Sequence, residues 1–216
     1  VEHKEIFASV PRLFVHPQDS LTNQYLSFVG VDPFASYRSL EGALVLHPMK
    51  SVSFEGYRIV TLDKKKPYCM GSNGFMFKKK LINEVGDYAQ DVEFIARIAK
   101  KGFDHFAVVD DARVWHKNVP NFKKFLTKRL RWINVYSKEY ILEKKDFNWI
   151  DNKFTFFFYV LFNLLFIPNF FVSLYKMIKY KNIAWILHAP LMFLCTVINI
   201  IFTLKSKAML RQLVKK

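Results

Sequence analysis

Residues 68–103 read YCMGSNGFMFKKKLINEVGDYAQDVEFIARIAKKGF, and this stretch decides the fold class. A turn of small residues, Gly71–Gly74, separates two apolar stretches, and a short apolar helix is predicted over Leu81–Val85. Apolar residues then recur at helical spacing from Val92 to Ala99, which predicts a second helix with Asp91 in its first turn. The stretch therefore contains two helices that follow a turn.

Short apolar runs surround this pair of helices on both sides. After Gly102, the runs Phe106–Val109 and Arg113–His116 predict two strands, and an alternation of strands with helices is typical of an α/β fold. Toward the N-terminus, Tyr57–Leu62 and Gly42–Leu46 are further strand candidates.

The first residues of the chain add a strand and a helix to this pattern. Ala8–Val15 predicts a strand, and Pro11 within it favours a position at the edge of the sheet, because proline cannot donate a ladder hydrogen bond. Leu21–Val29 predicts a short helix. The polar opening, Val1–Glu5, carries no apolar core or cleavage site, so no signal peptide is expected there.

A long amphipathic helix is predicted from Asn121, which would serve as its N-cap, to Lys145. Its apolar face is surrounded by lysines and arginines, an arrangement that suits a helix resting on a membrane interface. An ordinary amphipathic helix packed on the domain would show the same pattern, and both descriptions can hold together.

Two uncharged runs follow, FTFFFYVLFNLLFIPNFFVSLY over 154–175 and IAWILHAPLMFLCTVINIIFTL over 183–204. A helix over either run would be about 33 Å long, which is sufficient to cross a bilayer. We therefore predict a hairpin of two transmembrane helices, with a kink at Pro168 and at Pro190. The alternative is a pair of buried helices in a soluble protein, which would normally show a polar stripe. His188 is expected to form an interhelical hydrogen bond rather than to bind a metal.

The distribution of charge supports a membrane surface as the partner. The 216-residue chain carries a formal net charge of +15, yet from Lys153 onward it has nine lysines and arginines and no acidic residue. Basic residues beside apolar runs are typical of membrane proteins, and no stripe or motif for reading nucleic acid is present. Fewer basic residues lie in the link than at the outer ends of the two runs, so both ends are expected in the cytoplasm.

The two cysteines, Cys69 and Cys195, predict neither a disulfide framework nor a zinc site.

The order of motifs along the chain resembles a known family. GSNGFMFKK is followed by Gly86-Asp87-Tyr88, QDVEFIARIAKKGF, VVDDARVWH, KRLRW and the apolar runs. This order resembles the C-terminal half of family-2 glycosyltransferases, which have the Rossmann-like GT-A fold. The resemblance implies an acceptor half of the catalytic domain over 1–120, an interfacial helix with its linker over 121–152, and a transmembrane hairpin with a basic tail over 153–216.

The resemblance implies a catalytic role for Asp91. The Glu-Asp pair of the family reads Gln90-Asp91 here, so Asp91 would be the base that takes the proton from the acceptor hydroxyl. The alternative is that Asp91 only caps its helix and interacts favourably with the helix dipole. If the acceptor is a polyprenyl phosphate, the attacking oxygen is already anionic and no base is needed.

Three further sites follow from the same resemblance. The turn residues Gly71, Ser72, Asn73 and Gly74 would contact substrate, and His116 would help to hold a divalent Mn or Mg ion near the donor diphosphate. Arg131 could hold donor phosphates and Trp132 could stack on a sugar, or the two could be an interfacial anchor. Lys128 stands where the family's Gln-x-x-Arg-Trp motif has Gln, which speaks against processive polymerisation.

The family's metal-binding Asp-x-Asp is absent from these residues, and Asp110-Asp111 is expected in a loop leading to Trp115 and His116. The donor half is therefore expected outside this sequence, and the piece alone is expected to be inactive. The predicted function is transfer from a nucleotide-diphospho-sugar to a lipid or glycan acceptor on the cytoplasmic face, in cell-envelope polysaccharide synthesis. Two alternatives remain: a non-catalytic membrane scaffold that kept the fold, and a small membrane protein whose basic domain binds anionic lipid.

Overall fold

The computed structural model describes residues 6–30, 32–36, 40, 42–44, 50–63, 68, 74–86, 91–141 and 152–205. The chain forms two compact units. Unit 1 comprises Val1–His16, Leu26–His116 and Asp146–Trp149, and unit 2 comprises Pro17–Tyr25, Lys117–Lys145 and Ile150–Lys216. Each unit is described by itself below.

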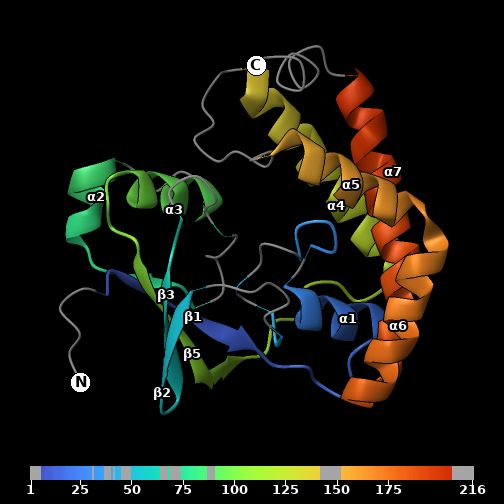
Figure 1. Ribbon diagram of the computed structural model, residues 1–216, viewed down its shortest axis with the longest axis horizontal. Helices are drawn as coiled ribbons and strands as arrows, with labels where there is room; N and C mark the ends of the chain where they lie inside the picture. The colour runs from blue at the N-terminus through green and yellow to red at the C-terminus, as the bar shows by residue number, and fades with distance from the viewer. Residues whose placement is uncertain are drawn as a thin grey trace. The chain divides into compact units, whose positions relative to one another are not determined.

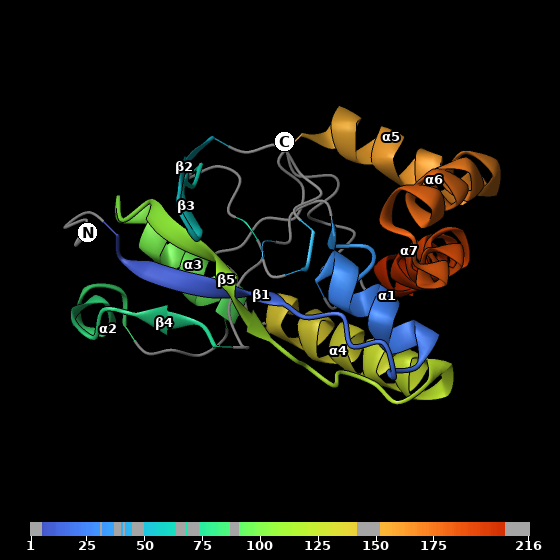
Figure 2. The same ribbon diagram turned by 90° about the horizontal axis from the view of Figure 1, so that it is seen from below.

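A five-stranded mixed sheet forms the centre of unit 1, with strand order β2-β3-β5-β1-β4 (Figures 1 and 2). The central pair, β1 and β5, is parallel, and every other pair is antiparallel. The strands are β1 Ala8–Leu13, β2 Ser51–Phe54, β3 Tyr57–Thr61, β4 Met76–Phe77 and β5 His105–Val114.

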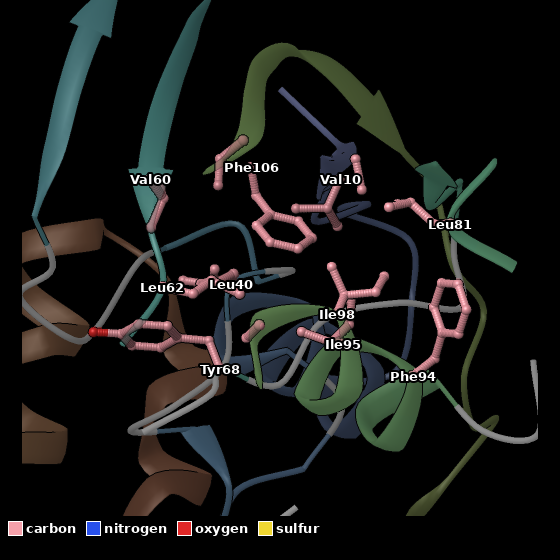
Figure 3. Packing of buried hydrophobic residues seen from close by; sticks show 13 residues of the cluster. Val10, Leu40, Val60, Leu62, Tyr68, Leu81, Phe94, Ile95, Ile98 and Phe106 are labelled. Carbon is pink, nitrogen blue, oxygen red and sulfur yellow. The ribbon is translucent and has the colours of Figure 1, made fainter. Parts of the chain in front are cut away.

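The core of unit 1 lies between this sheet and helix α3, Asp91–Lys100. Ile95 and Ile98 of α3 are fully buried and belong to one cluster with Val10 of β1 and Phe106 of β5 (Figure 3). Each such side chain contributes about 1.5–3 kcal/mol through removal of its apolar surface from water. The apolar residues whose helical spacing predicted α3 are thus the residues that pack against the sheet.

Helix α2, Lys80–Val85, packs beside α3, and helix α1 spans Leu21–Val29. All three predicted helices of this part of the chain are confirmed, as is the strand predicted over Tyr57–Leu62, which ends one residue earlier. Gly42–Leu44 of the predicted strand Gly42–Leu46 form a bend instead, and Val45 and Leu46 lie outside the described residues.

The edge position predicted for the first strand is wrong. β1 lies inside the sheet, between β5 and β4. However, β4 pairs only with Ala8 and Ser9, and the register against β5 shifts between Pro11 and Arg12. Proline is tolerated at such an irregularity, because no regular ladder bond is required of its nitrogen.

The two short strands predicted over 106–109 and 113–116 are one strand, β5. In its pairing with β1, Pro11 is opposite Val109 and Arg12 is opposite Arg113, so Asp110–Ala112 bulge out of the ladder. The backbone N–H groups of Asp110 and Asp111 donate to the carbonyl of Gly56 at 2.9 and 3.2 Å, which keeps the bulge within the strand. The polar Asp-Asp sequence predicted a break where the structure has a bulge.

Unit 2 is helical in its described part (Figure 1). Its elements after α1 are α4 Phe122–Ile141, α5 Lys153–Leu164, α6 Phe166–Tyr180, the 3₁₀ helix η2 Ile183–Leu187 and α7 His188–Lys205. Asn121 caps α4 as predicted, because its Oδ1 accepts the backbone N–H of Lys124 at 3.0 Å.

Only one of the two predicted membrane spans is found as a continuous helix. Ile183–Lys205 is long and apolar enough to cross a membrane, whereas the first run is divided into α5 and α6, which meet at 79°. The break follows from Pro168, whose ring clashes with the carbonyl four residues earlier, at Leu164, where α5 ends. The predicted kink is therefore a full break, and the bent pair counts as a second span only if both helices are taken together.

Candidate functional site

The carboxyl ends of the parallel strands β1 and β5 form the candidate site. In open sheets with parallel strands, ligands bind outside these ends, where loops diverge. Leu13 of β1 pairs with Val114 of β5, so the residues that follow both strands leave the sheet together.

Three aromatic side chains meet where the two strands end. The His16 imidazole stacks on the Trp115 indole with ring centroids 4.6 Å apart and planes at 24°, and Phe14 contacts His16 edge-on at 6.0 Å. Trp115 is more than half exposed. An exposed aromatic face of this kind can stack on a sugar ring or a base. The sequence analysis missed His16; its place directly after an apolar strand was the available signal.

His116 follows Trp115 and is half-buried. One residue, Trp115, separates it from the last residue of β5, so its position at this end of the sheet is set by the strand. Its predicted role at a metal is not tested by the geometry and stays a prediction.

Asp91 is the first residue of α3. Helix α3 is joined to β5 by the short turn at Lys101–Asp104 and packs on the sheet. In its first turn, Phe94 contacts Phe77 of β4, which pairs with Ala8 at the start of β1, so these contacts place the start of α3 nearer the beginning of β1 than its carboxyl end. The Asp91 side chain lies outside the described residues, so its roles as base or cap stay predictions.

Gly74 contacts the same region of the sheet. It has a positive φ of 73°, and a Cβ on it would lie 2.9 Å from Cγ of Pro11 and 3.5 Å from Cγ2 of Val114. Both features require glycine here, and they place the end of the predicted substrate turn against β1 and β5. Gly71, Ser72 and Asn73 lie outside the described residues.

A cluster of charged residues holds the β5 bulge. Arg58 of β3 donates two hydrogen bonds to the Asp110 carboxylate, at 2.8 and 2.7 Å, and the Arg12 guanidinium lies 3.7 Å from it. Arg12 also donates to the carbonyls of Leu40 and Ala43. The pKa of Arg12 is lowered to about 10, mainly by its burial and then by repulsion from the nearby Arg58. Attraction to Asp110 raises this pKa and offsets part of the decrease.

The two arginines give the Asp110 carboxylate a structural role in the sheet. The carboxylate accepts from Arg58 and attracts Arg12, so it is occupied in holding the strand. The described residues contain no group of three or more His, Cys, Asp and Glu that could hold a metal ion. The described residues near His116 thus do not form a complete metal site by themselves.

Replacing Arg58 with Met should lower the free energy of unfolding by about 1 kcal/mol, because a two-point hydrogen bond to a partly exposed carboxylate is lost. Chemical denaturation followed by pulse proteolysis would measure the change. Arg113→Met is the matched control, since Arg113 is exposed on the same sheet. Equal losses in both variants would show that the Arg58–Asp110 pair is not stabilising.

Arg131 and Trp132 lie on α4 of unit 2, and both are exposed. One turn before them, the Lys128 ammonium donates to Oδ1 of Asn118. Burial, together with the neighbouring Arg131, lowers the pKa of Lys128. Lys128 thus has a local partner in unit 2. The substrate roles predicted for Arg131 and Trp132 stay predictions.

Comparison with known proteins gives one match. No curated protein and no solved structure matches the chain. The sequence model described as Glycosyl transferase family group 2 matches residues 44–202, which include β2 to β5, the whole of α4 to α6 and most of α7. The five-stranded mixed sheet fits a GT-A-like domain. The match covers more than half of the sequence, and the chain belongs to glycosyl transferase family group 2.

Proposed function

We propose that the chain supplies the acceptor side of an inverting glycosyltransferase, which moves a sugar from a nucleotide-diphospho-sugar to a lipid or glycan acceptor at the cytoplasmic membrane surface. The observation that carries the proposal is the stacked pair of His16 and Trp115 beyond the carboxyl ends of β1 and β5, an aromatic surface of the kind that binds sugar rings. Membership of the family supports transfer of a sugar as the reaction.

In the proposed reaction, Asp91 accepts the proton of the acceptor hydroxyl while its oxygen attacks the anomeric carbon. The bond from that carbon to the donor phosphate breaks, and the nucleoside diphosphate leaves. The N-terminus of α3 favours the ionised form of a carboxylate, which is the form that a base requires. The helix dipole and the base role are thus compatible.

The aromatic group at the end of the sheet would bind the sugar. Stacking of the Trp115 and His16 rings leaves an indole face that fits the apolar face of a pyranose. His116 would lie near the donor diphosphate, and a divalent ion, when bound, would neutralise charge on the leaving group. Arg131 and Trp132 would contribute donor-phosphate and sugar contacts from α4.

Membrane attachment is supported by the reversed burial pattern of unit 2. Asn163, Asn169 and Ser173 are buried among α5, α6 and α7, whereas Ile167 and Ile178 are 69% and 74% exposed. The Asn169 amide donates to Oδ1 of Asn163 at 3.1 Å, which satisfies polar groups inside the helix pair. A soluble helix pair would place its apolar side chains inside, while lipid favours the observed order.

Calorimetry on the full-length protein in membranes, titrated with a panel of nucleotide-diphospho-sugars plus manganese, tests this function. We expect heat of binding with one donor and release of its nucleoside diphosphate when acceptor is present. Arg131→Ala should weaken donor binding, whereas Lys123→Ala, an exposed charge on the same helix, should not. Absence of heat with every donor would favour the non-catalytic scaffold.

A further inference from the structure

The apolar helix α7 carries polar contacts to other parts of unit 2 at both of its ends. Near its start, the Asn182 amide donates to Oε1 of Gln24 at 3.1 Å, and the His188 imidazole shares a 2.8 Å hydrogen bond with the Tyr25 hydroxyl. Near its end, the Arg129 guanidinium of α4 donates to Oδ1 of Asn199 at 3.1 Å. Polar elements therefore meet this helix along most of its length.

These contacts share one face of α7. His188 and Asn199 are eleven positions apart, which is about three helical turns, so both point the same way. On the opposite side, Phe193 and Ile201 of α7 and Ile186 of the preceding η2 are partly exposed apolar side chains. α7 therefore carries its polar contacts on one side, packs also on α5 and α6, and leaves apolar side chains exposed on the other side.

A crossing orientation conflicts with this arrangement. Asn182 and Asn199 are separated by about 25 Å along the helix, close to the thickness of the hydrocarbon core. Their partners are tied together on one side, because Oδ1 of Asn23 accepts the backbone N–H of Val119 at 3.1 Å, and α4 begins three residues later.

If α7 crossed the bilayer, the segment from Val119 to Arg129 would have to follow it through the hydrocarbon. That segment includes Lys123, Lys124 and Lys128, and charged side chains at that depth are among the costliest placements in a membrane protein. An orientation parallel to the membrane surface avoids this, because the exposed apolar side chains of α5, α6 and α7 can meet lipid while α1 and α4 remain at the aqueous surface.

We propose that unit 2 binds the lipid bilayer as an in-plane module, in which α7 and the bent pair α5–α6 enter one leaflet and return without crossing. The exposed apolar face of these helices contacts acyl chains. Lys179, in the last turn of α6, and Lys181, in the turn after it, match anionic headgroups. The inference rests on the membrane attachment of the proposed function. It replaces the two expected membrane crossings by helices that lie within one leaflet.

Single-cysteine labelling of the full-length protein in sealed vesicles tests the orientation. In a Cys69→Ser, Cys195→Ala background, cysteine would replace Lys179 or Lys205, which flank η2 and α7, or Glu84 on α2; all three positions are exposed. With a membrane-impermeant maleimide, we expect all three to label from the same side. Labelling of the Lys179 and Lys205 positions from opposite sides would overturn the proposal.

Spin-label depth measurements give a second readout that does not depend on vesicle orientation. Labels would be placed at three partly exposed apolar positions, Ile186 of η2 and Phe193 and Ile201 of α7. An in-plane helix gives the same ratio of oxygen to nickel-complex accessibility at all three, at a depth of about 5–10 Å. A crossing helix gives the highest ratio at Phe193, and that result would contradict the proposal.

Fractionation separates this inference from the function on which it rests. Recovery of the full-length protein in the aqueous phase after alkaline carbonate extraction, with no spin-label contact to lipid, would contradict both the in-plane module and membrane attachment. A crossing result would contradict the in-plane module alone. Sugar transfer, measured separately, is unaffected by either outcome.

Discussion

Replacing Asp91 with Asn is expected to lower kcat for sugar transfer by about 10²–10⁴-fold, the usual contribution of a positioned general base. Asparagine keeps the size of the side chain and its capacity to accept a backbone N–H, but it cannot take the acceptor proton. A merely structural role as a cap would be nearly preserved by this substitution, since Asn and Asp cap helices about equally well. The KM for the donor should change little.

Initial rates of nucleoside diphosphate release by the full-length protein would measure the effect across a range of pH. Glu84→Gln is the matched control, because it removes an exposed carboxylate from the neighbouring helix α2. Unchanged turnover in Asp91→Asn would refute the base role and point to an acceptor that is already anionic, such as a polyprenyl phosphate. Membership of the family would stand in either case.

Replacing Phe106 with Ala is expected to lower the free energy of unfolding by about 3–5 kcal/mol, because a large buried ring is lost and a cavity remains. Phe106 lies in β5, pairs with Ala8 of β1 and Val60 of β3, and is fully buried. Figure 3 shows its ring between the sheet and α3, near Val10 and Ile98. For a domain of ordinary stability, this is a third or more of the total.

Pulse proteolysis across a urea series would measure the loss. Met76→Ala on β4 is the control, because Met76 is 67% exposed and its truncation should cost less than about 0.5 kcal/mol. Similar losses in the two variants would contradict the assignment of Phe106 to the centre of the core.

The helices of unit 1 and their core faces could be predicted from the sequence, because helical periodicity is a local property. Spacing from Val92 to Ala99 predicted both the existence of α3 and the face that packs on the sheet. The same holds for α1 and for the Asn121 cap of α4.

Strand arrangement could not be predicted in the same way. Pro11 indicated an edge strand by a local rule, yet β1 is interior because β5 and β4 pair with it on its two sides. The proline is tolerated because β4 ends before reaching it. Asp110 and Asp111 indicated a break, whereas Gly56, on the turn between β2 and β3, accepts both of their backbone N–H groups and keeps the strand continuous. In each case the deciding partner lies far away in the sequence.

In the candidate site, too, local motifs could be recognised in the sequence, whereas contacts between distant residues could not. Asp91, Gly74 and His116 were selected by motif. The structure places the backbones of Gly74 and His116 near the carboxyl ends of β1 and β5, and that of Asp91 at the start of α3. The Arg58–Asp110 pair was not foreseen, because its members are 52 residues apart. Nor was the contact of His16 with Trp115, which depends on the parallel pairing of their strands.

Composition and periodicity were sufficient to predict the α/β class, the helices and the strongly apolar character of residues 154–204, since each is a property of neighbouring residues. The family was indicated by the order of motifs along the chain, and the family match shows it. The order of strands, the holding of the β5 bulge by Arg58 and the polar face of α7 became known only from the folded chain. Those features depend on which distant segments meet, and hydrogen bonds between distant residues leave no periodic trace in the sequence.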